Sequence, residues 1–312
     1  MSLLIIGTVA FDDIETPFGH AEKIVGGAAT YIAWAASYFT DTIRMVSIIG
    51  DDFPAAELEA LQQRGVDTSG IKVVEGGKSF FWAGKYHHNL NSRETLITDL
   101  NVLADFDPIL PADYRDSEYV MLGNLTPSIQ LSVIRQMTKR PKVIALDTMN
   151  YWMDSAMDEL KEVLAHIDLL IINEDEARQL SGQYSLMRAN EEIRKMGPQY
   201  LVIKKGEHGA LLFAEDNVFF SPALLLTEVQ DPTGAGDTFA GGLMGYLAGN
   251  EDLSFEVLKQ AIICGSAMAS FCVEKFGTEA LREISQADLM ERLDRFSIMM
   301  QFQVPGVRKT FL

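Results

Sequence analysis

Residues 231–237 read Asp-Pro-Thr-Gly-Ala-Gly-Asp and run directly into an apolar segment that begins Thr-Phe-Ala-Gly-Gly. Phe239, Leu243 and Leu247 recur in that segment at four-residue spacing, which predicts a helix that starts at the glycines and ends at Gly249-Asn250. The first N–H groups of a helix have no partner inside it, and together with the helix dipole they attract an anion. The stretch therefore predicts a strand-to-helix turn that binds an anion.

The same stretch carries the residue types that phosphoryl transfer needs. Gly234, Ala235 and Gly236 are small enough for backbone N–H groups to approach a phosphoryl group, and Asp237 lies where it can take a proton from an alcohol. Two simpler interpretations remain: a tightly packed turn, and an Asp that only complements the helix dipole. The dinucleotide-binding fingerprint does not fit, because Phe239 stands at its third glycine position.

Composition indicates a globular protein and restricts its partners. The 312 residues are 47% hydrophobic and 22% charged, which suits one large α/β domain or two smaller ones. The net charge of −18 argues against nucleic acid and against an anionic membrane surface as partners. Residues 1–6 are apolar without a basic leader, and no run approaches the roughly 18 apolar residues of a membrane helix. We therefore expect a cytoplasmic protein whose two cysteines, Cys264 and Cys272, stay reduced.

Strand-like and helical segments alternate along almost the whole chain. This alternation is typical of parallel strands joined by right-handed crossovers, with helices on both faces of the sheet. Two further runs, Ala210–Ala214 and Val218–Ser221, flank the turn signal Asp216-Asn217 and predict an antiparallel hairpin at one edge. The expected strands are Leu3–Ile6, Arg44–Ile49, Tyr119–Leu122, Val143–Leu146, Leu169–Ile172 and Leu201–Lys204, and the expected helices include Ala28–Tyr38, Ala55–Arg64, Ser128–Thr138, Ser155–His166, Glu174–Leu180, Ala189–Met196, Glu256–Glu274 and Gln286–Phe296.

Two regions depart from this alternation and predict a second, smaller sheet. Residues 71–106 contain no good helix, and residues 11–25 are similarly strand-like. The alternative is a plain β extension within the core. A projecting sheet leaves an apolar face exposed unless a ligand or a partner covers it, so we expect a homodimer built through this sheet.

Four further motifs accompany residues 231–237 along the chain. They are Gly7-Thr8-Val9-Ala10-Phe11-Asp12, Gly26-Gly27-Ala28-Ala29, Asn173-Glu174-Asp175-Glu176 and Lys204-Lys205-Gly206-Glu207-His208-Gly209. Together they resemble the signatures of the ribokinase (PfkB) family of carbohydrate and nucleoside kinases, from Gly7 to about Gly277. The resemblance implies a ribokinase-like α/β fold, a three-layer α/β/α arrangement with a mostly parallel central sheet and a small β-sheet lid. It also implies a single kinase domain over residues 1–312, with the lid contributed by about 11–25 and 71–106.

The resemblance assigns the acceptor site and the reaction centre. Asp12, at the exit of the first strand, would hold acceptor hydroxyls, a task that suits a carboxylate because it accepts from two hydroxyls at once. Gly26 and Gly27 would let the backbone approach a sugar ring and present free N–H groups. Asp237 would be the general base, and the N–H groups of residues 234–236 would hold the transferred phosphoryl group.

The resemblance also implies metal sites. Asn173 and Glu176 match the family's Asn-x-x-Glu motif, so they would organise Mg²⁺ and its waters near the nucleotide phosphates. The simpler interpretation is an Asn N-cap followed by acidic residues in the first helical turn, which the same four residues satisfy. Asp231 is similar in position to a ligand of a monovalent cation in several relatives, so K⁺ is a further candidate cofactor.

The nucleotide site is carried over from less specific segments. The roles of Lys204 and Lys205 stay open, between contact with phosphate and solvated charges at a strand end. Ala267 and Phe271 resemble residues of the helix that forms a wall of the adenine site in the family, although core packing explains such small and apolar residues equally well. The residues assigned to ATP are Lys205, Gly206, Gly209, Thr233, Ala267 and Phe271.

We therefore predict an ATP-dependent kinase that transfers the γ-phosphoryl group to a hydroxyl, a primary CH₂OH, of a sugar or sugar-like substrate. The nearest alternative is an adenosine or nucleoside kinase of the same family. The aromatic lid residues Phe81, Trp82 and Tyr86 favour it, because a base can stack on them. A non-catalytic nucleotide- or sugar-binding regulator is the alternative from another class, and the intact Asp237 argues against it because a regulator needs no base. Arg93 is a further lid candidate with no motif behind it.

Overall fold

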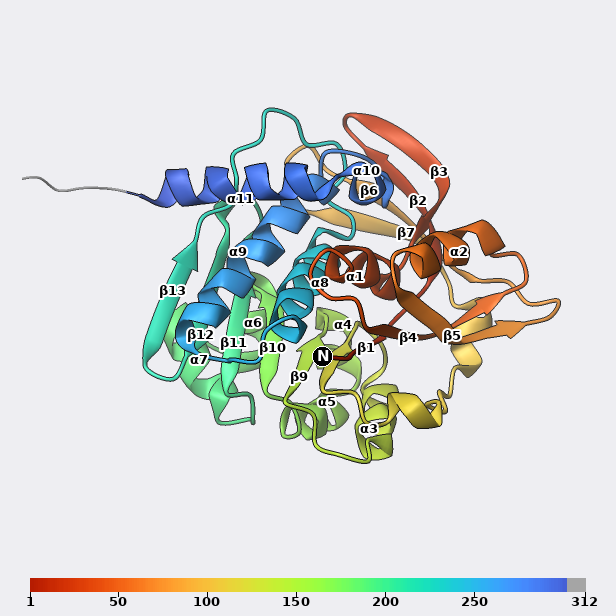
Figure 1. Ribbon diagram of the computed structural model, residues 1–312, viewed down its shortest axis with the longest axis horizontal. Coiled ribbons are helices and arrows are strands. Elements are labelled where there is room, and N and C mark those ends of the chain that lie inside the picture. The colour runs from red at the N-terminus through yellow and green to blue at the C-terminus, as the bar shows by residue number, and fades with distance from the viewer. Residues whose placement is uncertain (302–312) are drawn as a thin grey trace, which may run out of the picture.

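The computed structural model describes residues 1–301 and contains two separate β-sheets (Figure 1). The larger sheet has nine strands in the order β13-β12-β11-β10-β9-β8-β1-β4-β5. All pairs from β11 to β5 are parallel, whereas β12 runs antiparallel to both of its neighbours, as the expected hairpin requires. Its strands are β1 (Leu3–Ile6), β4 (Ile43–Gly50), β5 (Val66–Val74), β8 (Tyr119–Leu122), β9 (Val143–Asp147), β10 (Leu169–Asn173), β11 (Tyr200–Lys204), β12 (Ala210–Ala214) and β13 (Asn217–Ser221).

Helices cover both faces of this sheet, so the expected three-layer α/β/α fold is confirmed. Every residue of β1 is buried, and its side chains alternate between two hydrophobic clusters, one on each face. One cluster joins the sheet to α1, α8, α9 and α11, and the other joins it to α3, α5, α6 and α7 (Figure 1). The helices are α1 (Ala28–Ala36), α2 (Ala55–Gln63), α3 (Pro127–Gln136), α4 (Asn150–Ser155), α5 (Met157–Leu164), α6 (Glu174–Ser181), α7 (Leu186–Arg194), α8 (Ala235–Ala248), α9 (Phe255–Cys272), α10 (Glu279–Glu283) and α11 (Gln286–Met300).

Glycines on α8 set how closely this helix approaches its neighbours. A Cβ on Gly241 would lie 2.4 Å from the carbonyl oxygen of Ile32, and one on Gly245 would lie 2.6 Å from the Cα of Ala36. Only glycine permits such contact between the backbones of α8 and α1. The start of α8, which carries the motif 231–237, is therefore held rigidly beside the start of α1.

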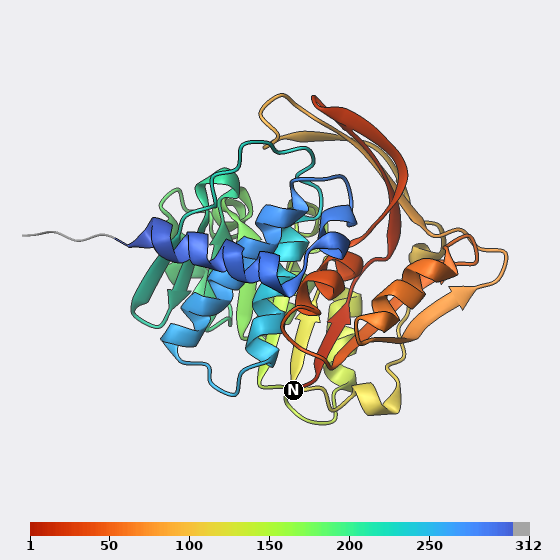
Figure 2. The same ribbon diagram turned by 45° about the horizontal axis from the view of Figure 1, so that its top comes forward.

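The smaller sheet has four strands in the order β3-β2-β6-β7 and stands out from the body of the molecule (Figure 2). Its strands are β2 (Ala10–Thr16), β3 (Gly19–Gly26), β6 (Phe80–Tyr86) and β7 (Arg93–Asp99). The sequence-based boundary at residue 71 was wrong. Residues 71–74 complete β5, because Ile71 to Val74 pair in parallel register with Ser47 to Gly50 of β4.

Helix α9 corrects one further expectation. Its 18 residues are apolar enough, by length and composition alone, to cross a membrane, although the sequence analysis expected no such segment. In the structure 61% of this segment is buried. Its small and apolar side chains pack against α8, where Met268 and Gly265 meet Gly242. The apolar character of α9 is therefore used in the protein core.

Candidate active site

The motif 231–237 forms the turn that opens α8. Gly234 has a φ of 73°, and a Cβ there would lie 2.4 Å from the ring of Tyr31, so both the backbone conformation and the lack of space require glycine. The Ala235 N–H donates to the Pro232 carbonyl oxygen at 3.2 Å, which closes the turn and occupies one of the three N–H groups expected to hold phosphate. Among residues 1–301 no backbone group accepts from the N–H groups of Gly234 and Gly236, which are therefore available to an anion at this helix start.

Asp237 lies in the first turn of α8 and is partly buried. Burial, followed by the nearby charge of Asp147, raises the pKa of Asp237 to about 7, against the attraction of Lys204 and Arg93. A carboxylate whose pKa lies near neutrality is well matched to removing a proton from an alcohol at physiological pH. The position of Asp237 beside the anion site fits the role that the sequence analysis assigned to it.

Lys204, whose role the sequence left open, lies at the same place. Its Nζ is 2.9 Å from where a Cβ on Gly236 would be, and 3.2 Å from Oδ1 of Asp147. Burial lowers the pKa of Lys204, but the attraction of Asp147, Glu176 and Asp237 outweighs it, so the pKa lies above its usual range. The ammonium group therefore stays charged at the start of α8.

Asn173 and Glu176 form a reciprocal capping box at the start of α6. The Glu176 N–H donates to Asn173 Oδ1 at 2.8 Å, and the Asn173 N–H donates to Glu176 Oε2 at 2.7 Å. The N-cap interpretation is thus satisfied. Burial raises the pKa of Glu176 to about 7, with Lys204 acting in the opposite direction.

The same residues fit a magnesium ion that keeps most of its waters. Oε1 of Glu176 is not used by the capping box, and the Asp147 carboxylate is close enough to influence the pKa of Glu176. Magnesium in nucleotide sites is held by one or two carboxylates together with substrate phosphates. Within residues 1–301 no three His, Cys, Asp or Glu side chains form a cage that could hold a metal by itself. A metal here would therefore depend on the nucleotide.

The residues assigned to the acceptor lie together. The Asp12 carboxylate fills the space beside Gly26, where a Cβ would lie 1.9 Å from its Oδ2. The N–H of Gly27 bonds to Asp12, and the first N–H groups of α1 donate to Thr8, with Ala28 N–H meeting Thr8 Oγ1 at 2.9 Å. The Gly27 N–H is therefore not free, because Asp12 already accepts from it, and the acceptor roles of Gly26 and Gly27 stay predictions. Burial, and then repulsion by Asp231 and Asp237, raises the pKa of Asp12 to about 8.

Asp231 joins two loops. Its Oδ1 accepts from the Thr233 N–H at 2.8 Å and its Oδ2 accepts from the Gly277 N–H at 3.3 Å. The side chain is completely buried. These bonds explain why an acid is needed at this position, and a role in binding a monovalent cation stays a prediction.

The loop that was assigned to the nucleotide is closed by glycines, and its two lysines form ion pairs with different acids. Gly206 and Gly209 have φ values of 55° and 95°, and the Lys205 N–H bonds the Gly209 carbonyl at 2.8 Å to close the loop. The Lys205 side chain forms an ion pair with Glu174, whereas Lys204 turns toward α8. Glu174 follows Asn173 directly, so the Lys205 side chain lies at the start of α6 and its assignment to the nucleotide stays a prediction.

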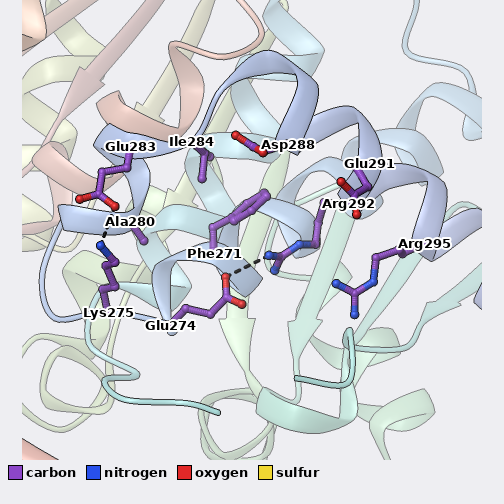
Figure 3. A pocket seen from close by; sticks show the side chains of 10 residues that line it. All are labelled: Phe271, Glu274, Lys275, Ala280, Glu283, Ile284, Asp288, Glu291, Arg292 and Arg295. Carbon is purple, nitrogen blue, oxygen red and sulfur yellow. Dashed lines mark hydrogen bonds and ion pairs between the residues drawn. The ribbon is translucent and has the colours of Figure 1, made fainter. Parts of the chain in front are cut away.

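The adenine wall expected on α9 is not found at Ala267 and Phe271. Ala267 is completely buried in the core, and Phe271 stacks under Arg292, whose guanidinium carbon lies 3.7 Å from the ring centre. Figure 3 shows Phe271 among the residues that line a cavity of about 400 Å³ between α9, α10 and α11. The periodicity of α9 turns these two side chains inward. Ion pairs such as Arg292–Glu274 and Lys275–Glu283 cross this cavity (Figure 3).

The small sheet touches the motif 231–237 directly. The Tyr86 hydroxyl is 3.1 Å from Thr233 Oγ1. Trp82 lies four residues before Tyr86, on the same face of β6, because side chains along a strand alternate between its two faces. Trp82 pairs with Asp12 in the register of β6 with β2, so the indole and the Asp12 carboxylate share one face of the sheet. Arg93 lies over the Trp82 ring at 5.5 Å. This sheet therefore carries residues that lie beside the motif 231–237 and beside Asp12, the residue assigned to the acceptor.

Known proteins are similar to this chain over most of its length. The model of the pfkB family of carbohydrate kinases matches residues 5–284. The chain is 29% identical over 283 residues to cytidine kinase of Thermococcus kodakarensis, covering 89% of this chain and 98% of that one. It is 27% identical over 320 residues to nucleoside kinase of Methanothermobacter thermautotrophicus, covering 97% of this chain and 98% of that one.

Solved structures share the fold. A putative ribokinase II of E. coli matches with a TM-score of 0.80 at 18% identity, covering 94% of this chain and 99% of that one. The same protein in complex with ATP and Mg²⁺ matches with a TM-score of 0.77. The fold is therefore ribokinase-like.

Proposed function

The chain belongs to the pfkB family of carbohydrate kinases, and we propose that it phosphorylates the primary hydroxyl of a nucleoside at the expense of ATP. Membership makes the chain a phosphotransferase with an alcohol acceptor, so the regulator considered from the sequence is set aside. The observation that carries the proposal is the position of Asp237 beside the N–H groups of Gly234 and Gly236 at the start of α8, where the ammonium of Lys204 also lies.

The proposed reaction has one chemical step. Asp237 takes the proton of the acceptor hydroxyl while its oxygen bonds to the γ-phosphorus of ATP, and the bond to the bridging oxygen of ADP breaks. The N–H groups of Gly234 and Gly236, with the dipole of α8, stabilise the charge on the transferred group. Asn173 and Glu176 would hold Mg²⁺ through its waters, and the ion would supply charge neutralisation for the phosphates.

Trp82 supports a nucleoside as acceptor. Asp12 can accept hydrogen bonds from two ribose hydroxyls, and the indole of Trp82, on the same face of the small sheet, offers a flat surface for the base. Two relatives that cover almost the whole chain are a cytidine kinase and a nucleoside kinase. The acceptor thus moves from the free sugar expected from the sequence to the nucleoside alternative.

A free sugar is the second candidate, and Arg93 is the observation that favours it. The guanidinium already lies over the Trp82 ring, which reduces the ring face open to a base. A small polar acceptor gripped by Asp12 needs no such face.

The experiment is ATP turnover by the purified protein with Mg²⁺, with and without K⁺, against a panel of nucleosides and free sugars. Turnover with a nucleoside only is the expected result, and turnover with a free sugar only would move the assignment to the second candidate. Turnover should be lost in Asp237→Asn and kept in its matched control Asp158→Asn, because Asp158 is an exposed acid in the first turn of α5. Absence of turnover with every acceptor would contradict the proposed function.

A homodimer through the small sheet also stays a proposal. All residues of β7 are exposed, among them Leu96 and Ile97, and Leu100 follows immediately. An exposed edge strand with apolar side chains is suited to pairing with a second copy. The molar mass of the protein by light scattering, compared with that of Leu96→Glu, would test it.

A further inference from the structure

A buried ion pair lies beside the start of α8, and no motif of the sequence predicted that its two side chains meet. Lys204 is the last residue of β11 and Asp147 is the last residue of β9, so β10 separates them in the sheet. Nζ of Lys204 and Oδ1 of Asp147 are 3.2 Å apart, and the two side chains are 18% and 11% exposed. The same Nζ lies 2.9 Å from where a Cβ on Gly236 would be. The ammonium therefore touches the first turn of α8.

The pair is placed unfavourably for stability. A helix start carries partial positive charge, so it attracts anions and repels an ammonium group. Removing a lysine and an aspartate from water also costs about as much as their attraction returns. Two packed apolar side chains would serve the core better, which indicates that the charge of Lys204 serves something other than stability.

Two adjacent lysines end this strand, and only the side chain of Lys204 lies against the start of α8. Lys205 pairs with Glu174 at the beginning of α6, on the other side of the strand end. Lys204 instead extends toward Gly236, where a phosphoryl group bound at the helix start would lie. A lysine ammonium is a compact charge with three N–H donors, so it can bond to Asp147 and to a phosphoryl oxygen at the same time.

We propose that Lys204 is a catalytic residue that donates a hydrogen bond to the γ-phosphoryl group of ATP during its transfer, and that Asp147 is a positioning residue that holds the ammonium in place. The inference rests on the proposed function. In the step the acceptor proton goes to Asp237, the acceptor oxygen bonds to phosphorus, and ADP leaves with the electrons of the broken bond. Lys204 keeps all its protons and only offsets the charge of the transferred group.

The first test compares nucleotide binding by calorimetry, which needs no turnover. Lys204→Met should weaken the binding of ATP with Mg²⁺ by about 10-fold or more, the loss expected for one hydrogen bond to a charged group. Binding of ADP with Mg²⁺ should change much less, because ADP lacks the γ-phosphoryl group. The control is Lys195→Met, which removes an exposed lysine paired with Glu192. Equal weakening of ATP and ADP by Lys204→Met would overturn the proposal.

The second test separates catalysis from folding. Lys204→Met leaves Asp147 buried without its partner, so this variant is expected to lose thermal stability as well as at least about 100-fold in kcat. The double variant Lys204→Met with Asp147→Asn removes both charges and should recover the melting temperature but not kcat. Recovery of both quantities would show that the pair is structural and would overturn the proposal. A wild-type protein without turnover would contradict the proposed function, while the comparison of ATP with ADP would still decide the role of Lys204.

Discussion

Replacing Asp237 with Asn should remove activity and stabilise the protein at the same time. The change keeps the size of the side chain and removes its charge, so the turn at the start of α8 is preserved. In the proposed reaction Asp237 accepts the proton of the acceptor hydroxyl, and a general base contributes about 10²- to 10⁴-fold to the rate. We expect kcat to fall by this amount while the affinity for ATP stays similar.

The gain in stability follows from the pKa of Asp237. Burial raises that pKa from 3.8 to about 7, so between these values the folded protein binds a proton that the unfolded chain has lost. The free energy of unfolding therefore falls as the pH rises from about 4 to about 7, at about 1.36 kcal/mol for each pKa unit. Above pH 7 the cost approaches 4 kcal/mol, and solvent screening of the partly exposed carboxylate reduces it to about 2–4 kcal/mol.

Asn at this position removes the cost. Unfolding entropy near the melting temperature scales with chain length, so for 312 residues about 2–4 kcal/mol corresponds to a rise of about 3–6 °C. The measurements are melting temperature by calorimetry at pH 8 and at pH 5, and turnover at pH 8. The rise should be larger at pH 8, because the cost of the charged side chain is fully present only above the folded pKa.

Two outcomes would refute this reasoning. An unchanged kcat would show that Asp237 is not the base. A lower melting temperature at pH 8 would show that the carboxylate stabilises the site, which contradicts the direction of its pKa shift. The control Asp158→Asn, in the exposed first turn of α5, should change neither kcat nor the melting temperature.

Three further predictions follow from the geometry. kcat/KM should rise with pH and level off above pH 7 to 8, because Asp237, with a pKa of about 7, must lose its proton to act as base; a flat profile from about pH 5 to 8 would contradict this. Gly26→Ala places a Cβ 1.9 Å from Asp12 Oδ2, so the carboxylate must move and the KM for the acceptor should rise by about 10-fold or more, with ATP affinity unchanged in calorimetry. Tyr86→Phe removes the bond to Thr233 and should lower kcat/KM by about 2- to 10-fold, the range for one neutral hydrogen bond, whereas no change would show that this contact does not hold the small sheet over the site.

Local motifs explain what the sequence could predict. The turn at Gly234, the capping box of Asn173 with Glu176, and the place of Asp12 beside Gly26 all depend on residues close together in the chain or on a close approach that only glycine allows. Such features leave a clear pattern in residue type and spacing. The parallel strands could be predicted for the same reason, because a strand buried on both faces is a continuous apolar run.

Contacts between distant segments explain what the sequence could not predict. Lys204 and Asp147 meet only because β9, β10 and β11 are neighbours in register, and nothing in either local sequence indicates the pair. Choosing between two adjacent lysines requires knowing which one faces α8. Phe271 was misplaced for a similar reason: an apolar residue on a buried helix can face a ligand or another helix, and here Arg292 of α11 covers it.

The charges of the site make a single lysine important. Asp12, Asp147, Glu176 and Asp237 belong to the proposed site, and burial is the first cause that raises the pKa of Asp12, Glu176 and Asp237. The whole chain adds a net charge of −18. A triphosphate therefore enters against an unfavourable field, and a helix start with two available N–H groups offsets only part of it. Magnesium would arrive with the nucleotide, whereas the ammonium of Lys204 is part of the protein and lies at the helix start, which is why we propose that it offsets the charge of the transferred group.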